Sequence, residues 1–362
     1  MSSLNIAISF NNESSLGQVM FQSGIAQNAK FLYDLLLRIG QRPYFLVSSP
    51  AAARRLEICG LGYKAYDYRE VLGMQQPTHL ALEVGVTIGQ AQRQQLRQKF
   101  GTKIVSVRYG HSMYMDMEEM CGDVARMKGA IHVNCPDRVW ASPHFEAAFS
   151  YLETLYQAPV QTCPFIWEPD FVRGGPKLGY KVKPNVYVME PNLSVLKNAL
   201  IPMAIIERQY REAPETFGAA YILNGQKFNE RPYFVDNIVR NFSSLIAQSN
   251  KAYFCGRARF VDVFKERDVL VGHQVDCQLN YLYMEAVYRN VPLVHNSPAF
   301  REVGFYYEGC DVRAGRAQLN AAIEAEDVVQ QEEAGQRFLD GYSIHNGAVQ
   351  AAYQGMIDEL FR

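Results

Sequence analysis

The sequence of 362 residues lacks the cysteine patterns that mark a disulfide framework or a zinc site. Its seven cysteines are odd in number and scattered, and none forms a CxxC pair. Folds held together by disulfides need paired cysteines, and zinc sites need closely spaced cysteines. We therefore expect buried, reduced thiols, which is the usual state of cysteine in the cytoplasm.

Long apolar runs are also missing. The apolar stretch at 199–206 is interrupted by Pro202 and is too short to span a bilayer. The opening residues, MSSLNIAISF, contain no basic segment followed by a long apolar segment, which an export signal would need. These absences predict a cytoplasmic protein without a membrane span.

An excess of charge of one sign is lacking, since 36 Lys and Arg residues stand against 37 Asp and Glu residues. This balance gives no general attraction to nucleic acid, which is therefore not favoured as a partner. One stretch differs, because no acidic residue lies between Glu83 and Asp116, where five cations occur: Arg93, Arg97, Lys99, Lys103 and Arg108. This stretch could meet an anionic acceptor, although an ordinary solvated helix face has the same pattern.

Apolar strands and amphipathic helices alternate through residues 1–165. Strands are predicted at 4–10, 43–49, 64–68, 78–84, 103–107 and 137–142, with helices at 28–39, 51–59 and 89–100. Repeated strand and helix units indicate an α/β fold with a parallel sheet, whose ligand cleft lies at the carboxyl edge.

Residues 166–184 are rich in proline, glycine and basic residues, which indicates a linker. Residues 185–345 predict a second α/β domain of similar size. Its strands are expected at 185–189, 221–223, 252–255, 268–271 and 293–295, and helices at 195–210, capped by Ser194, and at 317–337. Residues 346–362 predict a last helix that could pack back on the first domain.

The stretch 268–303 is the most informative part of the chain. Its first strand ends at Gly272, Asp276 is placed to cap a helix, and Asn290 can take the left-handed conformation that ends one. The helix start then presents unpaired backbone N–H groups at the carboxyl edge of a parallel sheet: those of Gln278, Leu279 and Asn280. With the positive end of the helix dipole, these groups predict an anion site.

The same stretch resembles a known motif. The order Glu285-Ala286, then Asn290-Val-Pro292-Leu-Val, then a polar loop and Glu302, resembles the nucleotide-sugar-binding motif of GT-B glycosyltransferases of the retaining, glycogen-synthase-like kind. In that family the acidic residue before Ala holds the ribose of the donor, and the helix start faces its diphosphate. The resemblance implies two Rossmann-like domains facing across a cleft.

The motif departs from the family at two positions. Asn290 replaces a glycine, which left-handed geometry tolerates, and Cys277 replaces a second Glu, so that Asp276 is the candidate substitute near the donor sugar. A Met-Glu-Pro-Asn-Leu-Ser segment at 189–194 is also similar to one in a bacterial and phage group of GT-B-like proteins. An ordinary α/β repeat with a surface Glu would give much of the same pattern.

Loops after other strands of the second domain supply further candidates for donor binding. GT-B enzymes often place a loop and a lysine near the donor diphosphate after the first strand of this domain, and a Gly-Arg pair after the strand 252–255 could approach phosphate. The donor-site candidates are Glu190, Asn192, Ser194, Lys197, Gly256, Arg257, Gln278, Leu279, Asn280 and Glu285. A solvated lysine and a plain turn are the alternative interpretations.

His111 is the catalytic candidate in the first domain. It follows the strand 103–107, at the edge where many GT-B enzymes keep a catalytic or acceptor-orienting histidine. A structural histidine is the alternative, and His79, Glu83 and Asp116 are further acid or base groups without a motif around them.

Together, the motifs predict a glycosyltransferase that moves a sugar from a UDP- or GDP-linked donor to an unidentified acceptor. No DxD-type pair follows a strand, so we expect neither a metal nor another cofactor. The alternatives are a nucleotide-sugar epimerase with the same fold, a glycosyltransferase that modifies nucleic acid, and a non-catalytic two-domain ligand-binding protein.

Overall fold

The computed structural model describes residues 3–10, 24–53, 62–122, 135–175, 178–179, 183–325 and 329–362. By its internal contacts, the chain divides into a first unit, Met1–Glu168 with Gly341–Arg362, and a second unit, Pro169–Asp340. Each unit is an α/β structure with its own parallel sheet, so the predicted fold class is confirmed. The domain limits expected at 165, 185 and 345 stay predictions, since the units are groupings by contact.

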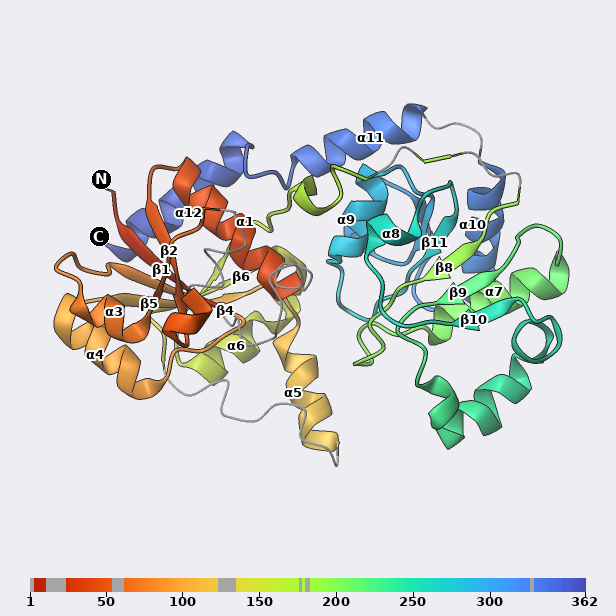
Figure 1. The fold of residues 1–362 in the computed structure, drawn as a ribbon, viewed down its shortest axis with the longest axis horizontal. Helices are drawn as coiled ribbons and strands as arrows, with labels where there is room; N and C mark the ends of the chain where they lie inside the picture. Colours follow the sequence, from red (N-terminus) through yellow and green to blue (C-terminus); the bar gives the residue numbers. More distant parts are fainter. Residues whose placement is uncertain are drawn as a thin grey trace. The chain divides into compact units, whose positions relative to one another are not determined.

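The first unit is built on a seven-stranded sheet in the order β3-β2-β1-β4-β5-β6-β7, of which Figure 1 labels β1, β2, β4, β5 and β6. All neighbouring strands are parallel. Strand order reverses between β1 and β4, which makes that position the switch point of a doubly wound fold. The strands are β1 (Asn5–Ser9), β2 (Arg42–Val47), β3 (Ala65–Asp67), β4 (Leu80–Val84), β5 (Lys103–Arg108), β6 (Arg138–Ala141) and β7 (Val160–Thr162).

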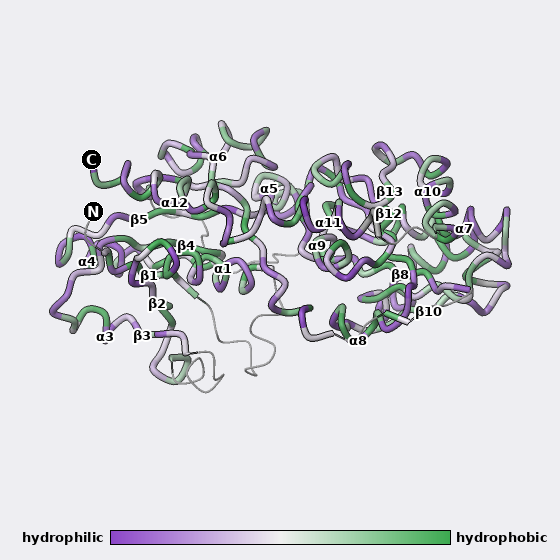
Figure 2. The backbone as a smooth tube through the Cα atoms, turned by 90° about the horizontal axis from the view of Figure 1, so that it is seen from above, coloured by the Kyte–Doolittle hydropathy of each residue, from purple (hydrophilic) through white to green (hydrophobic). Residues whose placement is uncertain are grey.

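The helices of the first unit differ in how much of their surface is buried, and most residues of α1 are buried. In α4, only Arg93 and Leu96 are buried, and most of the helix is hydrophilic (Figure 2). Leu96 packs with residues of β1, β4 and β5 in one core cluster. The described helices are α1 (Gly24–Arg38), α3 (Tyr68–Gly73), α4 (Gln90–Phe100), α5 (Ser112–Cys121), the 3₁₀ helix η1 (Pro143–Ala148), α6 (Phe149–Tyr156) and α12 (Gly347–Leu360).

The last helix, α12, belongs to the first unit. The Tyr353 hydroxyl donates to the Pro164 carbonyl at 2.8 Å and lies 2.5 Å from the Tyr109 hydroxyl. The Tyr353 ring, which is fully buried, meets the Trp140 ring edge-on. Residues more than 180 positions apart therefore share one core.

The second unit is built on a six-stranded parallel sheet in the order β10-β9-β8-β11-β12-β13. Its switch point lies between β8 and β11. The strands are β8 (Val186–Val188), β9 (Ala220–Ile222), β10 (Ala252–Phe254), β11 (Val269–Val271), β12 (Leu293–His295) and β13 (Phe305–Tyr306).

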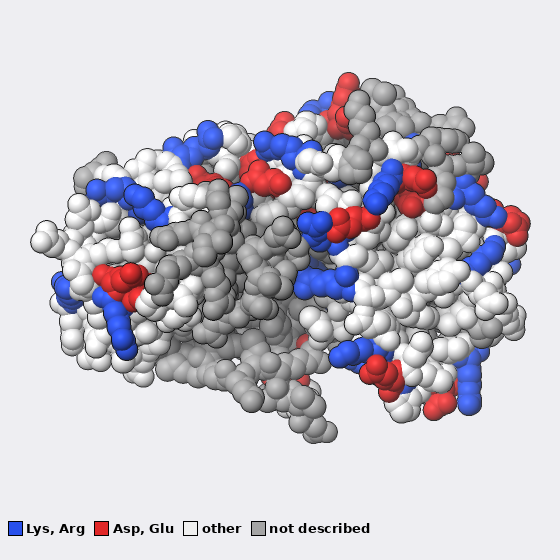
Figure 3. Space-filling view, viewed as in Figure 1, with Lys and Arg blue, Asp and Glu red and all other residues white. Residues whose placement is uncertain are grey.

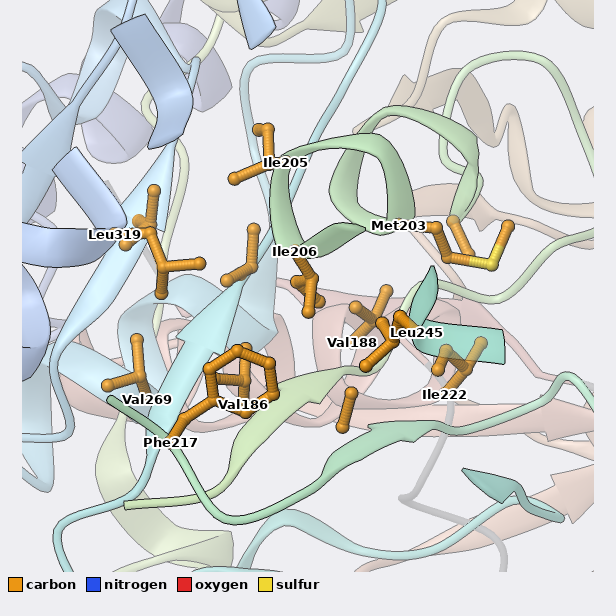
Figure 4. Packing of buried hydrophobic residues seen from close by; sticks show 14 of the residues in the cluster. Val186, Val188, Met203, Ile205, Ile206, Phe217, Ile222, Leu245, Val269 and Leu319 are labelled. Atoms are coloured by element: carbon orange, nitrogen blue, oxygen red, sulfur yellow. The ribbon is translucent and has the colours of Figure 1, made fainter. Parts of the chain in front are cut away.

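One face of the second sheet is covered by α7 and α10. Figure 4 shows Ile206 of α7 directed toward these strands, and Leu319 of α10 lies in the same buried cluster. The described helices are α7 (Leu200–Glu212), η3 (Phe228–Glu230), the π-helices η4 (Phe234–Val239) and η5 (Ser243–Gln248), α8 (Phe260–Val263), α9 (Tyr281–Tyr288), η6 (Pro298–Phe300), α10 (Val312–Glu324) and α11 (Val329–Asp340).

The predicted strands are confirmed to within a few residues, but two predicted helices are wrong. The helix expected at 195–210 begins at Leu200 after Ala199, and Ser194 does not cap it but forms a bridge with Lys197. The helix expected at 317–337 is two helices, α10 and α11. Of the helix expected at 51–59, residues 54–59 lie outside the described residues.

Candidate functional site

The loops after β8 and β11 meet at the switch point of the second unit. We call these loops, residues 189–199 and 272–280, the switch edge. The Val275 N–H donates to the Leu196 carbonyl at 2.9 Å, which joins the two loops directly. In open α/β sheets, ligands bind at the carboxyl ends of the strands beside such a switch point. Most of the predicted donor-site residues lie here.

Glu190 lies at the centre of the switch edge and is fully buried. Its Oε1 accepts hydrogen bonds from the His273 N–H at 3.1 Å and from the Tyr283 hydroxyl at 3.4 Å. Burial raises the pKa of the Glu190 carboxyl to about 7, although the Lys197 charge opposes this rise. Glu190 can therefore hold a proton near neutral pH.

The Tyr283 ring reaches Glu190 because residue 272 is a glycine. A Cβ atom there would lie 2.7 Å from Cζ of Tyr283 and nearer still to its hydroxyl oxygen. Real Cβ atoms essentially never approach other atoms so closely. Gly272 thus leaves room for the Tyr283 ring to pack against the loop after β11.

Lys197 lies in the turn between β8 and α7. Its ammonium group donates to the Leu279 carbonyl at 2.8 Å, so the cation spans the two loops of the switch edge. The turn is held by Asn192, which has a left-handed backbone with φ of 55°. The Asn192 amide donates to the Glu190 carbonyl, and its Oδ1 accepts from the Ala199 N–H.

The helix α9 begins later than predicted. Its N-cap is Asn280, whose Oδ1 accepts from the Leu282 N–H at 3.1 Å, and Asp276 instead has a left-handed backbone with φ of 45°. Gln278 and Leu279 therefore precede the helix and are not in its first turn. Their carbonyls accept hydrogen bonds from Ser297 and Lys197.

The end of α9 is confirmed as predicted. Asn290 has a left-handed backbone with φ of 53°, directly after the C-cap Arg289. The Asn290 N–H donates to the Val287 carbonyl and the Val291 N–H to the Ala286 carbonyl, which is the Schellman pattern. Glu285, the motif residue, lies on this helix and is partly buried.

Several polar residues of this region were missed by sequence reasoning. The side chains of Gln274 and Asn296 hydrogen-bond each other's backbones, which ties the loop after β11 to the loop after β12. His273 is buried, its Nδ1 lies 2.9 Å from the Tyr307 hydroxyl, and burial lowers its pKa to about 4. The polar run after Gly272 was the available signal.

Gly256 and Arg257 follow β10, the edge strand of the second sheet. The strand β9 stands between β10 and β8, so this pair lies two strands away from Glu190. A Cβ atom on Gly256 would lie 2.6 Å from Oε1 of Gln226, so this glycine allows close packing within the loop.

In the first unit, His111 follows β5 at the carboxyl edge of the sheet. It occupies the N-cap position of α5, but its side chain makes no capping hydrogen bond. It is 3% exposed, and its ring meets Tyr114 and Phe145 edge-on at centroid distances of 4.5 and 5.5 Å. His144 of η1 is a second histidine near this edge, with Nδ1 2.8 Å from the Ser142 hydroxyl.

The other acid and base candidates of the first unit have structural partners. Glu83 is buried in an ion pair with Arg93, and the Nε–Oε1 distance is 2.9 Å. Asp116 accepts from the Tyr151 hydroxyl at 2.6 Å. His79 precedes β4, at the amino edge, and its Nδ1 accepts from the Asn5 N–H.

The basic stretch of the first unit is largely paired. Arg97 and Lys103 both face Asp137, at 2.9 and 3.7 Å, and Arg93 is buried against Glu83. Acidic and basic side chains are also interspersed on the face shown in Figure 3. These pairs reduce the charge that the stretch would offer to an anionic acceptor.

Among the described residues, no group of three or more His, Cys, Asp or Glu side chains could hold a metal ion. The six described cysteines are free thiols, and Cys121, Cys135 and Cys310 are exposed, so the expectation of buried thiols is wrong for these three. No helix in the described part of the chain is long and apolar enough to cross a membrane.

A family model described as "Protein of unknown function (DUF2827)" matches residues 6–357. The chain belongs to this family. No curated protein sequence matches the DUF2827 chain.

Solved structures resemble the DUF2827 chain over nearly its whole length. The pneumococcal O-GlcNAc transferase GtfA, solved in complex with UDP and GlcNAc, has a TM-score of 0.60 at 9% identity, and the match covers 100% of this chain and 100% of that chain. Trehalose-6-phosphate synthase OtsA has a TM-score of 0.60 at 11% identity, with 99% of each chain covered. The DNA-modifying enzyme β-glucosyltransferase has a TM-score of 0.57 at 10% identity, with 99% of this chain and 100% of that chain covered. These similarities show the GT-B fold that the motif predicts.

Proposed function

We propose that this chain is a glycosyltransferase that takes a sugar from a nucleotide-sugar donor bound at the switch edge. The observation that carries the proposal is the match of the whole chain to GtfA, which was solved with UDP and GlcNAc. The motif residue Glu285 supports it, because α9 also carries Tyr283, which binds Glu190 at the switch edge. The donor is a UDP- or GDP-linked hexose, and transfer needs no metal.

Lys197 is the proposed cation for the donor diphosphate. Glycosyl transfer releases a nucleoside diphosphate, whose growing negative charge needs fixed donors and a cation. Lys197 is already anchored across both loops by the Leu279 carbonyl. The other proposed donor contacts are Glu190, Asn192, Ser194, Gly256, Arg257, Gln278, Leu279, Asn280 and, at the ribose, Glu285.

Calorimetric titration with UDP and GDP tests this function. We expect one of them to bind and to raise the melting temperature by mass action. Lys197→Ala and Glu285→Ala should each weaken binding by about 1 to 3 kcal/mol, the range for hydrogen bonds to charged groups. Lys183→Ala is the matched control, because Lys183 pairs with Glu215 at the surface of the same unit.

The result that would refute the proposal is an absence of binding by UDP, GDP and their sugar conjugates to the folded wild-type chain. Equal affinity in Lys197→Ala and in the Lys183→Ala control would remove Lys197 from the site. Release of free nucleoside diphosphate from a UDP- or GDP-sugar, with the sugar recovered on an acceptor, would separate a transferase from an epimerase.

A further inference from the structure

The buried carboxyl of Glu190 joins three segments of the second unit. It belongs to the loop after β8, accepts from the backbone of His273 after β11, and accepts from the hydroxyl of Tyr283 on α9. The amide groups of Asn192 and Asn224 donate to the Glu190 carbonyl at 3.0 and 3.1 Å. Backbone and side chain of Glu190 are therefore both fixed.

Burying a carboxyl group in this way costs free energy unless its oxygens are hydrogen-bonded. Glu190 is fully buried, and its Oε2 has no hydrogen-bond partner among the described residues. A buried carboxylate is strongly disfavoured without full hydrogen bonding, and protonation removes most of that cost. Hydrophobic packing alone would not require a carboxyl group at this position.

Glu190 is the buried group of the switch edge whose charge changes near neutral pH, and the charge of Lys197 acts on its carboxyl. Of the titratable groups that face Glu190, Tyr283 and Tyr307 have pKa values raised far above neutral by burial, so both stay uncharged. Burial also lowers the pKa of His273 to about 4, so its ring is neutral. The charge of Lys197 is thus opposed only by an ionised Glu190 within this set.

We propose that Glu190 is a positioning residue for the donor, and that it holds its loops ready for a nucleoside diphosphate when its carboxyl carries a proton. This inference rests on the proposed function. A protonated Glu190 leaves the Lys197 charge available to phosphate, whereas an ionised Glu190 competes for that cation and repels the anion. Donor affinity should then be linked to the protonation of one buried group.

The test is the affinity for UDP and GDP at pH 6 and pH 8, measured by calorimetry on the full chain. Glu190→Gln imitates the protonated acid, so its affinity should lose the part of the pH dependence that Glu190 causes. Between pH 6 and pH 8, the nucleotide affinity of wild type should fall about tenfold more than that of Glu190→Gln. This difference is the expected effect of one negative charge that appears on Glu190 as pH rises. Ionisation of the nucleotide itself is common to both proteins and cancels in this comparison.

Glu207→Gln is the matched control within the same unit. Glu207 is also buried, but it binds the backbone of Ser244 and Leu245 and pairs with Arg211, away from the switch edge. This variant should keep the wild-type pH dependence of affinity even where it lowers stability. Tyr283→Phe provides a second perturbation: it removes one donor to the carboxylate, so the pH at which affinity falls should shift upward.

Binding with the same pH dependence in wild type and Glu190→Gln would overturn this inference and leave the proposed function standing. If Glu190→Gln does not fold, an unshifted pH dependence in Tyr283→Phe would overturn it instead. Absence of binding by UDP and GDP at both pH values would overturn the proposed function and this inference together.

Discussion

Gly315 and Gly355 lie in helix interiors with opposite surroundings, so the same substitution to alanine should change stability in opposite directions. At Gly315 in α10, a Cβ atom would lie 2.9 Å from Cγ1 of Ile205 in α7 and nearer still to Cδ1. At Gly355 in α12, a Cβ atom would have no neighbour within 4 Å. Gly315 therefore allows the close approach of α10 to α7, whereas Gly355 is an exposed helix position.

The magnitudes follow from two opposing effects. Alanine is favoured over glycine in a helix interior by about 1 kcal/mol. Overpacking of a core typically costs about 1 to 3 kcal/mol, and Ile205 is fully buried and has to change its rotamer. Gly355→Ala should therefore stabilise by about 1 kcal/mol, and Gly315→Ala should destabilise by up to about 2 kcal/mol.

Chemical denaturation checks both values with two probes. Both tryptophans, Trp140 and Trp167, belong to the first unit, so fluorescence reports the unit that contains Gly355. Circular dichroism follows both units. Ile205→Ala removes the clashing atoms, so the Gly315→Ala substitution should cost less in that background. Equal stabilisation by Gly315→Ala and Gly355→Ala would refute the packing argument.

Three further predictions concern ionisable groups. Because folding raises the pKa of Glu190 from 4.5 to about 7, its contribution to stability is present below about pH 4.5 and is lost as pH rises through 7. At pH 8, the free energy of unfolding of Glu190→Gln should exceed that of wild type by up to about 3 kcal/mol. At pH 4.5 this difference should vanish. Arg93→Met leaves Glu83 buried without its partner and should cost about 3 to 5 kcal/mol at neutral pH by denaturation, with much of this recovered when Glu83→Gln is added. His111→Ala should lower the rate of transfer by about 10² to 10⁴-fold with nearly unchanged donor affinity, whereas the control His79→Ala, at the amino edge, should transfer at the wild-type rate. A loss of donor affinity in His111→Ala would contradict its predicted role as a catalytic or acceptor-orienting histidine.

Most strands could be predicted from the sequence because they are short apolar runs, whereas β7 and β13, which are not fully buried, were not predicted. Val269–Val271 and Leu293–His295 are fully buried, and runs of this kind stand out without knowledge of their neighbours. The end of α9 was equally local, since Asn290 and Pro292 lie only two positions apart in sequence. Local signals were sufficient wherever the structure depends on local contacts.

The start of α9 could not be predicted in this way. Asp276 and Asn280 are both good caps by residue type. The structure uses Asn280, because Gln274 binds the Cys277 N–H and is itself held by Asn296, which lies 22 residues further along the chain. The choice between two local signals thus depends on a distant loop.

The centre of the candidate site was beyond sequence reasoning for the same reason. Glu190 was predicted as a donor contact because it follows a strand. Its bond to Tyr283 joins residues 93 positions apart, and no periodicity or spacing indicates such a pair. Parallel sheets bring such residues together only after the whole strand order is formed.

The placement of α12 has a consequence for the order in which the chain can fold during synthesis. The first unit needs residues 341–362, and Tyr353 completes its core against Trp140. A ribosome releases the complete second unit, Pro169–Asp340, before it releases that helix. Since domains fold as units as they emerge, the half of the protein that is started first is finished last. In a chain that stops after residue 340 we therefore expect an intact second unit and a first unit whose core lacks Tyr353.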